Sequence, residues 1–311
     1  MAPLREVSIV HVDHIHFGQQ RAQQVLEIKH IKKNIMKRIL LLTDFSDNAL
    51  LAAKQVALCT EAWKTEKVIV YHTYNSVTIV NNEPIVIVND EVKEAKEKEL
   101  TQWFDQIRLL FPPQVELSHQ MEDIDLPMGV NDMCKSHNID LVALGITGQT
   151  GFAKILVGSN AITLMDICDK PMLIVSHKVN PAVPKNVLAT TDLKEVDRKL
   201  DLFNLDQVLD TFEAQLYVLN VAKKEGSAAD LAQELKHLHE RLDKYHPIYD
   251  YISHDDITEG IAQYAKEKHI DLILSFHKKQ GLLASLFKAS ISKKIAWNGA
   301  ANLLVIPMER S

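Results

Sequence analysis

The chain has 311 residues and a formal net charge of −6 at pH 7, and it is long enough for two domains of ordinary size. It shows no basic excess, which argues against a nucleic-acid partner. No apolar run approaches the roughly 20 residues that span a bilayer, and the first residues lack the apolar core of a signal peptide. These totals predict a soluble protein without a membrane partner, and the cytoplasm is the default location.

Residues 1–35 do not share the pattern of the rest. They carry His11, Asp13, His14 and His16 in one short tract. His-rich tracts can bind metal, but no further ligand stands nearby. We therefore expect a loosely ordered extension without a metal site, and assign it no function.

Residues 36–179 alternate apolar strands with amphipathic helices, which is typical of a parallel sheet. After the first strand, at 38–43, Asp44 or Ser46 could cap the helix that follows. Further strands are expected at 68–71, 115–119, 141–144 and 172–175. Helices are expected at 91–110, at 127–136 and from about 159, with Leu100, Trp103, Phe104, Ile107 and Leu110 on the buried side of the first of these. An apolar, β-branched excursion at 74–90 predicts an extra hairpin or a lid.

The order of elements repeats after a linker at 180–184, so residues 185–311 are predicted to form a second domain. The segment from Lys185 matches the segment from Lys37 at an offset of 148 (185 minus 37). The segment from Asp271 matches the segment from Asp140 at an offset of 131 (271 minus 140). The difference of 17 agrees with the excursion at 74–90. The chain is therefore predicted to be a tandem duplication with an insertion in its first half. Asp140 and Asp271 are expected to cap or to form salt bridges.

The stretch after the fourth strand of the first half is rich in glycine. Gly145 and Gly148 precede Gly158-Ser159, which opens the next helix. A glycine lets a ligand approach the backbone, and a helix N-terminus favours phosphate. The stretch has neither the Gly-Lys-Ser/Thr ending of a P-loop nor the glycine spacing of a dinucleotide fingerprint. Tight turns and close helix–sheet packing are the alternative explanation for these glycines.

The second half serves as an internal control. It carries Phe276, Lys279 and Ala289 where the first half has its three glycines. We expect these side chains to prevent nucleotide binding of the same kind, while Lys278 and Lys279 are read as an exposed pair. Asp192 is retained opposite Asp44, so Asp44 either faces a ligand or serves the helix start alone.

The spacing Gly-x2-Gly-x9-Gly-Ser resembles the ATP-binding branch of the universal stress protein family. The resemblance extends to Thr43-Asp44-Phe45-Ser46 and Lys170-Pro171, and so covers 36–179. It implies two tandem Rossmann-like α/β domains, each a doubly wound parallel sheet with strand order 3-2-1-4-5. It also implies ATP as the ligand, with no metal beyond nucleotide-bound Mg.

The resemblance also assigns roles to residues. Thr43 and Asp44 would lie by the adenine, and the backbone at His72 and Thr73 would line the base pocket. The glycines would pass close to ribose and phosphates. The residues assigned to the nucleotide are Thr43, Asp44, Thr73, Leu144, Gly145, Gly148, Gly158, Ser159 and Asn160. Lys154 is a further phosphate partner or a solvated lysine.

No catalytic motif is visible, and Cys59, Cys134 and Cys168 form no CxxC pair and are expected as buried thiols in helices. Since members of the family mostly bind or regulate, we expect a stress-response protein that is not an enzyme, with at most weak ATP hydrolysis. The apolar fifth strands, at 172–175 and 303–306, would pair the two halves as an internal pseudo-dimer, and a homo-oligomer remains an alternative. A ligand-free interaction module and, less favoured, a weak nucleotide hydrolase are the other functions left open.

Overall fold

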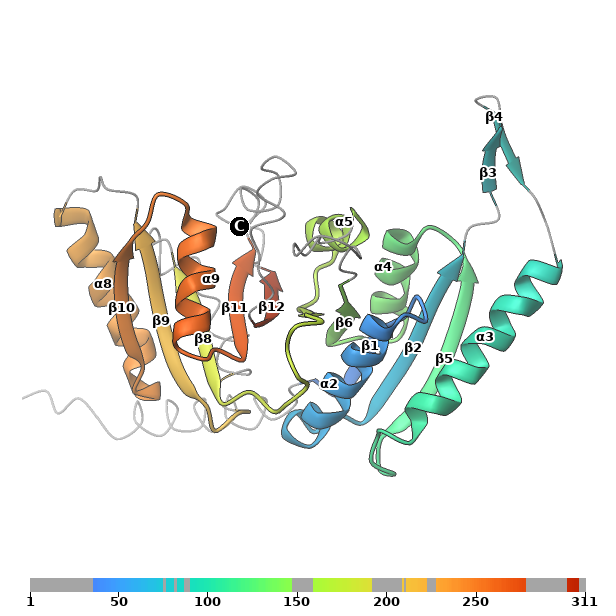
Figure 1. The fold of residues 1–311 in the computed structure, drawn as a ribbon, viewed down its shortest axis with the longest axis horizontal. Coiled ribbons are helices and arrows are strands. Elements are labelled where there is room, and N and C mark those ends of the chain that lie inside the picture. Colours follow the sequence, from blue (N-terminus) through green and yellow to red (C-terminus); the bar gives the residue numbers. More distant parts are fainter. Residues whose placement is uncertain are drawn as a thin grey trace, which may run out of the picture. The chain divides into compact units, whose positions relative to one another are not determined.

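The structure is a computed structural model. It describes residues 36–74, 77–80, 83–86, 90–146, 159–191, 209, 211–222, 228–277 and 301–307 (Figure 1). The His-containing tract at 11–16, Lys154, Lys278 and Lys279 lie outside these residues. The residues from 35 onward form one compact unit, to which everything below refers.

The first half contains a parallel sheet with strand order β5-β2-β1-β6-β7. Numbered along this half, the order is 3-2-1-4-5, which confirms the predicted topology. The strands are β1 (Arg38–Leu42), β2 (Lys67–Tyr74), β5 (Glu116–Asp123), β6 (Leu141–Gly145) and β7 (Met172–Val175).

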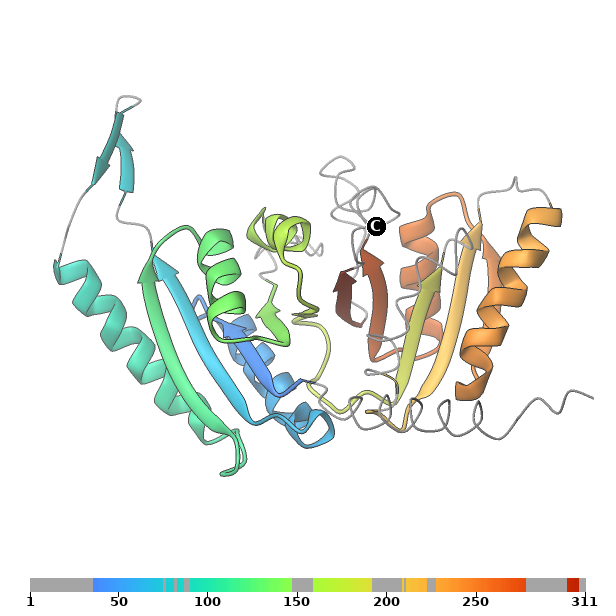
Figure 2. The same cartoon turned by 180° about the vertical axis from the view of Figure 1, so that it is seen from behind.

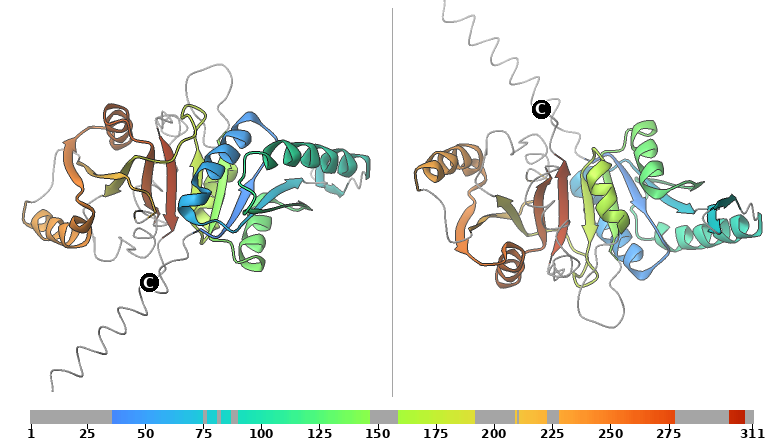
Figure 3. Two further views of the ribbon diagram at one scale, coloured as in Figure 1. Left: turned by 90° about the horizontal axis from the view of Figure 1, so that it is seen from below. Right: turned by 90° about the horizontal axis from the view of Figure 1, so that it is seen from above.

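Helices cover both faces of these strands (Figure 3). They are α2 (Asp47–Trp63), α3 (Asp90–Arg108), α4 (Leu126–Ser136) and α5 (Ser159–Ile167). Side chains alternate between the two faces of a strand, so β2 sends Val68 and Val70 into the core under α2 and α3. Ile69 and Tyr71 enter the core under α4 and α5. Because both faces are buried, β1, β6 and β7 read as nearly continuous apolar runs, whereas the outer strand β5 is only partly buried and largely polar.

Two predicted details are wrong. Leu110 is 36% exposed, because α3 ends at Arg108 and the chain has already turned away. Cys168 is buried as expected, but it follows the end of α5 instead of lying within the helix.

The predicted hairpin in the excursion is confirmed. Strands β3 (Val77–Val80) and β4 (Glu83–Val86) pair antiparallel and form a separate two-stranded sheet. They lie between β2 and α3 in the chain (Figures 1 and 2). The insertion therefore adds an element to the first half without interrupting its sheet.

The second half repeats the topology, with strand order β10-β9-β8-β11-β12 and parallel neighbours. Its strands are β8 (Asn186–Thr191), β9 (Gln215–Ala222), β10 (Ile248–Ser253), β11 (Leu272–His277) and β12 (Asn302–Pro307). Its described helices are α8 (Ala228–Leu242), the 3-10 helix η1 (Asp243–Tyr245) and α9 (Ile257–Glu267). The tandem duplication predicted from the offsets is thus visible in the fold.

The two halves join through their fifth strands. β7 pairs antiparallel with β12, with Leu173 opposite Leu304, and the result is one ten-stranded sheet. The predicted strand pairing is therefore present. It buries both strands, and it leaves β5 and β10 at the two ends of the sheet.

A buried polar cluster accompanies this joint, and we call it the Gln55 latch. The Gln55 side chain of α2 donates from Nε2 to the Ala182 carbonyl oxygen (2.7 Å) and accepts at Oε1 from the Ala182 N–H (3.1 Å). Asn302 of β12 donates to the same Oε1 (3.2 Å) and accepts from the Ser176 N–H (3.0 Å). The Gln55 latch thus connects a helix of the first half to the linker and to the last strand of the second half.

Candidate functional site

In this topology the sheet changes winding direction between β1 and β6. These strands are parallel neighbours, with Leu40 opposite Val142. Ligands of doubly wound sheets bind outside the carboxyl ends of the strands at such a point. The loop after β1, at Thr43–Ser46, and the segment after Gly145 flank it.

The loop after β1 is held by local hydrogen bonds. The N–H of Thr43 donates to the Tyr71 carbonyl oxygen (3.0 Å), which fixes the loop to β2. The Thr43 hydroxyl accepts from the Phe45 N–H (3.0 Å). Ser46 is the N-cap of α2 and accepts from the Ala49 N–H (3.3 Å). Of the two predicted capping residues, the structure selects Ser46.

Asp44 is exposed beside the cap. Its Oδ1 accepts from both the N–H (3.1 Å) and the hydroxyl (2.5 Å) of Ser46. The carboxylate therefore orients the capping serine and still faces solvent. Either role anticipated for Asp44, loop support or ligand contact, is compatible with this position.

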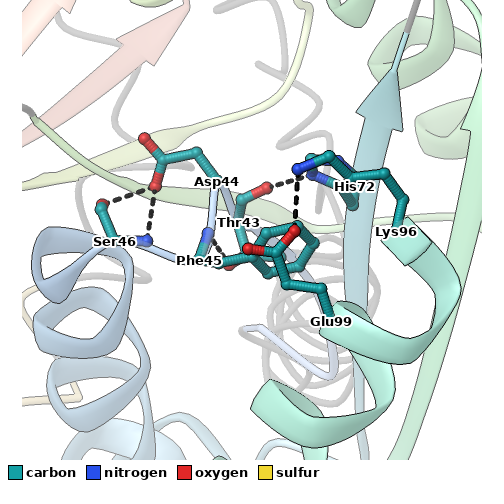
Figure 4. Close-up of polar contacts among 7 residues, drawn as sticks. All are labelled: Thr43, Asp44, Phe45, Ser46, His72, Lys96 and Glu99. Atoms are coloured by element: carbon teal, nitrogen blue, oxygen red, sulfur yellow. Dashed lines mark hydrogen bonds and ion pairs between the residues drawn. The ribbon is translucent and has the colours of Figure 1, made fainter. Parts of the chain in front are cut away.

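His72, at the end of β2, is a buried polar residue beside the same loop (Figure 4). Its Nδ1 lies 2.8 Å from the carbonyl oxygen of Thr43. The Phe45 ring packs on the imidazole with centroids 4.3 Å apart, and Phe45 has a positive φ of 66°. A positive φ in a bulky residue is a strained conformation.

Helix α3 completes this cluster. The Lys96 ammonium lies 5.3 Å from the centre of the Phe45 ring, and it pairs with Glu99 at 2.8 Å. Burial lowers the pKa of His72, and Lys96 lowers it further. The hydrogen bond to Thr43 and the carboxylates of Glu99 and Asp44 oppose the decrease in this pKa.

From the sequence, His72 was expected at the site only through its backbone, and Lys96 and Glu99 of α3 were not expected there. The available signal was a histidine that directly follows the apolar run of β2. No sequence signal indicated Lys96 and Glu99, because their place beside the loop depends on how α3, which follows the inserted hairpin, packs against the sheet.

Gly145, the last residue of β6, has a packing role. A Cβ added here would overlap the carbonyl oxygen of Asn48 and lie 2.9 Å from the Ala49 nitrogen. The first turn of α2 therefore packs directly on the Gly145 backbone. This contact supports the packing explanation for this glycine, and it brings α2 close to β6.

The remaining predicted residues divide into two groups. Leu144 is buried in β6, and Thr73 is half-buried in β2 opposite Glu122. Ser159 and Asn160 are the first two residues of α5. Gly148 and Gly158 lie outside the described residues. The structure thus gathers Thr43, Asp44, Thr73, Leu144 and Gly145 at the carboxyl ends of three adjacent strands.

Two of the three cysteines meet in the core, although they are distant in sequence. The Cys134 thiol donates a hydrogen bond to Cys168, which together with burial raises the pKa of Cys134. Cys59 is buried beside Gln55, and burial raises its pKa to about 12. Cys59 and Cys134 are therefore unreactive as nucleophiles, in agreement with their expected structural role. The hydrogen bond from Cys134 lowers the pKa of Cys168, which is also buried.

Comparison with known proteins agrees with this fold. Residues 36–176 match the model of the "Universal stress protein family". The first half of the chain belongs to this family. Among curated proteins there is no significant match.

Solved structures extend the likeness to both halves. A universal stress protein from Archaeoglobus fulgidus is 19% identical and superposes with a TM-score of 0.65, over 89% of this chain and 98% of that chain. A structure described as a universal stress protein candidate from Pseudomonas aeruginosa is 13% identical, with a TM-score of 0.58 over 89% and 95% of the two chains. These identities are low, so this likeness shows the fold alone. No described helix has the length and apolar character needed to cross a membrane.

Proposed function

We propose that the first half binds an adenine nucleotide, ATP, at the carboxyl ends of β1, β2 and β6, and that the protein is a cytoplasmic regulator in the stress response. One observation carries the proposal: Thr43, Asp44 and Gly145 meet at the switch point of the sheet in the half that belongs to the universal stress protein family.

The chemistry of this edge suits a nucleotide. Asp44 is exposed and can accept hydrogen bonds from a ribose hydroxyl or a base amino group. Helix α5 begins at Ser159, and the first N–H groups of a helix have no partner within it. Such N–H groups and the helix dipole stabilise phosphate. Magnesium would arrive with the nucleotide.

The second half would act as a fixed partner. Its β12 pairs with β7 and covers an apolar strand that would otherwise be a sheet edge. An internal pseudo-dimer of this kind would keep β7 of the first half paired while the nucleotide binds and dissociates. The proposed activity is binding, with ATP turnover at background level.

Calorimetric titration of ATP into the full chain tests this proposal. We expect one site per chain, with affinity reduced about tenfold or more in Asp44→Ala, because a charged hydrogen bond contributes about 1.5–3 kcal/mol. Asp192→Ala, at the matching position of the second half, is the control and should bind like the wild type. The double variant Gly148→Lys, Gly158→Ala copies the second half and should not bind. Equal effects of Asp44→Ala and Asp192→Ala would contradict the assignment.

A ligand-free interaction module is the second candidate, and one observation favours it. The contact between Gly145 and Asn48 explains that glycine without a nucleotide. In this case no heat of binding appears with ATP, ADP or AMP. The glycines then serve packing and turn geometry only.

A further inference from the structure

His72 is unusual because its two ring nitrogens are treated differently by the fold. The residue is 9% exposed. Nδ1 has a partner in the Thr43 carbonyl oxygen, whereas Nε2 is buried and has no hydrogen-bond partner among the described residues. A buried polar atom without a partner carries a desolvation cost, so its retention calls for an explanation.

The hydrogen bond to Thr43 defines the protonation state of the ring. A carbonyl oxygen can only accept, so Nδ1 must carry the proton. In the neutral imidazole Nε2 then holds a lone pair. Protonation would turn Nε2 into a buried donor, and a charged donor needs an acceptor more strongly than the lone pair needs a donor.

Three charged groups act on His72 in the structure. Lys96 and Glu99 come from α3 and Asp44 from the loop after β1. Lys96 and Glu99 are paired to each other at 2.8 Å. Lys96 disfavours a cationic His72, whereas Glu99 and Asp44 favour it. The pairing of Lys96 with Glu99 is therefore compatible with a neutral His72. A protonated His72 would be repelled by Lys96 and attracted by Glu99.

We propose that His72 is a positioning residue that makes the loop at Thr43–Ser46 sensitive to protons, because a protonated His72 would take Glu99 from Lys96. This inference rests on the proposed function where it concerns the nucleotide. The change in pairing itself concerns only residues of this chain.

The change of partner by Glu99, from Lys96 to His72, would affect the loop at Thr43–Ser46 through Phe45. The Phe45 ring is close to both His72 and Lys96: its centre lies 4.3 Å from the imidazole centre and 5.3 Å from the Lys96 ammonium. Its backbone has a φ of 66°, a conformation that persists only where the surroundings enforce it. When Glu99 turns to His72 and Lys96 is released, this support weakens. Asp44 and Ser46, on either side in the loop, would then lose their present arrangement, and nucleotide affinity would fall in acid.

An NMR titration of the full chain tests the pairing directly. The imidazole of His72 should titrate below its ordinary pKa, and the Phe45 and Lys96 signals should shift with the same midpoint. Glu99→Gln removes the negative charge that favours the imidazolium and should move this midpoint further down. Lys96→Met removes the repelling charge and should move it up. A His72 that titrates with no response in Phe45 or Lys96, or midpoints unaffected by either variant, would overturn the proposal.

Nucleotide affinity as a function of pH supplies the functional readout. Between about pH 7.5 and about pH 5 we expect the affinity of the wild type for ATP to fall about tenfold more than that of His72→Asn. The Asn amide can still donate to the Thr43 carbonyl oxygen but cannot titrate. Since phosphate itself titrates with a second pKa of about 6, the variant measured at the same pH values is the necessary reference. Parallel pH profiles for the two proteins would contradict the inference.

Amide hydrogen exchange separates failure of this inference from failure of the proposed function. If no nucleotide binds at any pH, the proposed function fails. Amide exchange rates in the 43–46 loop and at the start of α3 still test whether protonation of His72 alters the loop. Faster exchange in acid than the chemical rate predicts, in the wild type but not in His72→Asn, supports it, and equal behaviour of the two proteins overturns it.

Discussion

The two halves share a framework and differ at its carboxyl edge. Asp140 in the first half accepts a hydrogen bond from the Arg38 N–H (2.9 Å). Its counterpart Asp271 accepts from the N–H groups of Lys185 (2.8 Å) and Asn186 (2.9 Å). In each half, the aspartate before the fourth strand thus accepts backbone hydrogen bonds from the start of the first strand.

Both halves have an aspartate at this position, whereas the three glycines of the first half are matched by other residues in the second. Gly145, packed on the backbone of α2, corresponds to Phe276 in the second half. The two halves therefore share the backbone hydrogen bonds at the start of the fourth strand and differ at its carboxyl end. Differences between matched positions therefore reveal which contacts belong to only one half.

The largest expected difference concerns the matched helix glycines Gly129 and Gly260. A Cβ at Gly129 would overlap the Tyr71 hydroxyl and lie 2.8 Å from Ile124, whereas at Gly260 its nearest neighbour is His254 Cβ at 3.0 Å. Alanine in place of glycine gains about 1 kcal/mol of helix propensity at either position, and overpacking costs about 1–3 kcal/mol. Displacing Tyr71 would also break its hydrogen bond to Glu122 (2.7 Å), at about 1 kcal/mol.

We therefore expect Gly129→Ala to lower the free energy of unfolding by about 2 kcal/mol and Gly260→Ala to leave it within about 0.5 kcal/mol. Urea unfolding of the two full-length variants measures both values. Tyr71→Phe in the Gly129→Ala background should recover part of the loss, because it removes the overlapping hydroxyl. Equal destabilisation by the two glycine variants would contradict the difference in packing.

The framework was predictable from the sequence because its signals are local. Apolar runs such as Leu141–Leu144 identify buried strands, and the offsets of 148 and 131 reveal the repeat without any structure. The boundary errors have physical causes. β2 continues to Tyr74 because β5 pairs along its whole length, and Leu110 is exposed because α3 ends at Arg108.

The site was only partly predictable, because its chemistry depends on tertiary contacts. The sequence predicted a strand-to-helix turn at Thr43, Asp44 and Ser46. Only the structure identifies Ser46 as the N-cap of α2. Among the described residues Nε2 of His72 has no hydrogen-bond partner, and Lys96 lies over the Phe45 ring because α3 packs beside the loop. No local pattern in the sequence encodes that docking.

The Gln55 latch lies at the joint between the halves and is formed by different residues on its two sides. Asn302 of this latch corresponds to Pro171 in the first half, so the joint is chemically asymmetric although the strands pair alike. Asn302→Ala would leave the Ser176 N–H without this acceptor and Gln55 without one donor. An unsatisfied buried group costs about 1–3 kcal/mol, so we expect a loss of about 2 kcal/mol.

A double-mutant cycle with Gln55→Ala tests this expectation, since residues in one network have non-additive effects. The coupling energy should be about 1 kcal/mol, read from urea unfolding of the wild type, the two single variants and the double variant. Additive losses would show that the two side chains act independently.

The smallest effect is expected at the pair with which the comparison began. Asp140 serves one N–H group and Asp271 serves two, and both carboxylates lie near the surface. Replacement by alanine should therefore cost about 1 kcal/mol at Asp140 and somewhat more at Asp271, because water can replace part of each bond. Asparagine at either position keeps an acceptor oxygen and should retain most of the stability. If Asp140→Ala cost more than Asp271→Ala, the first strand of the nucleotide-binding half would depend on its aspartate beyond the hydrogen bond seen here, and the two frameworks would no longer count as equivalent.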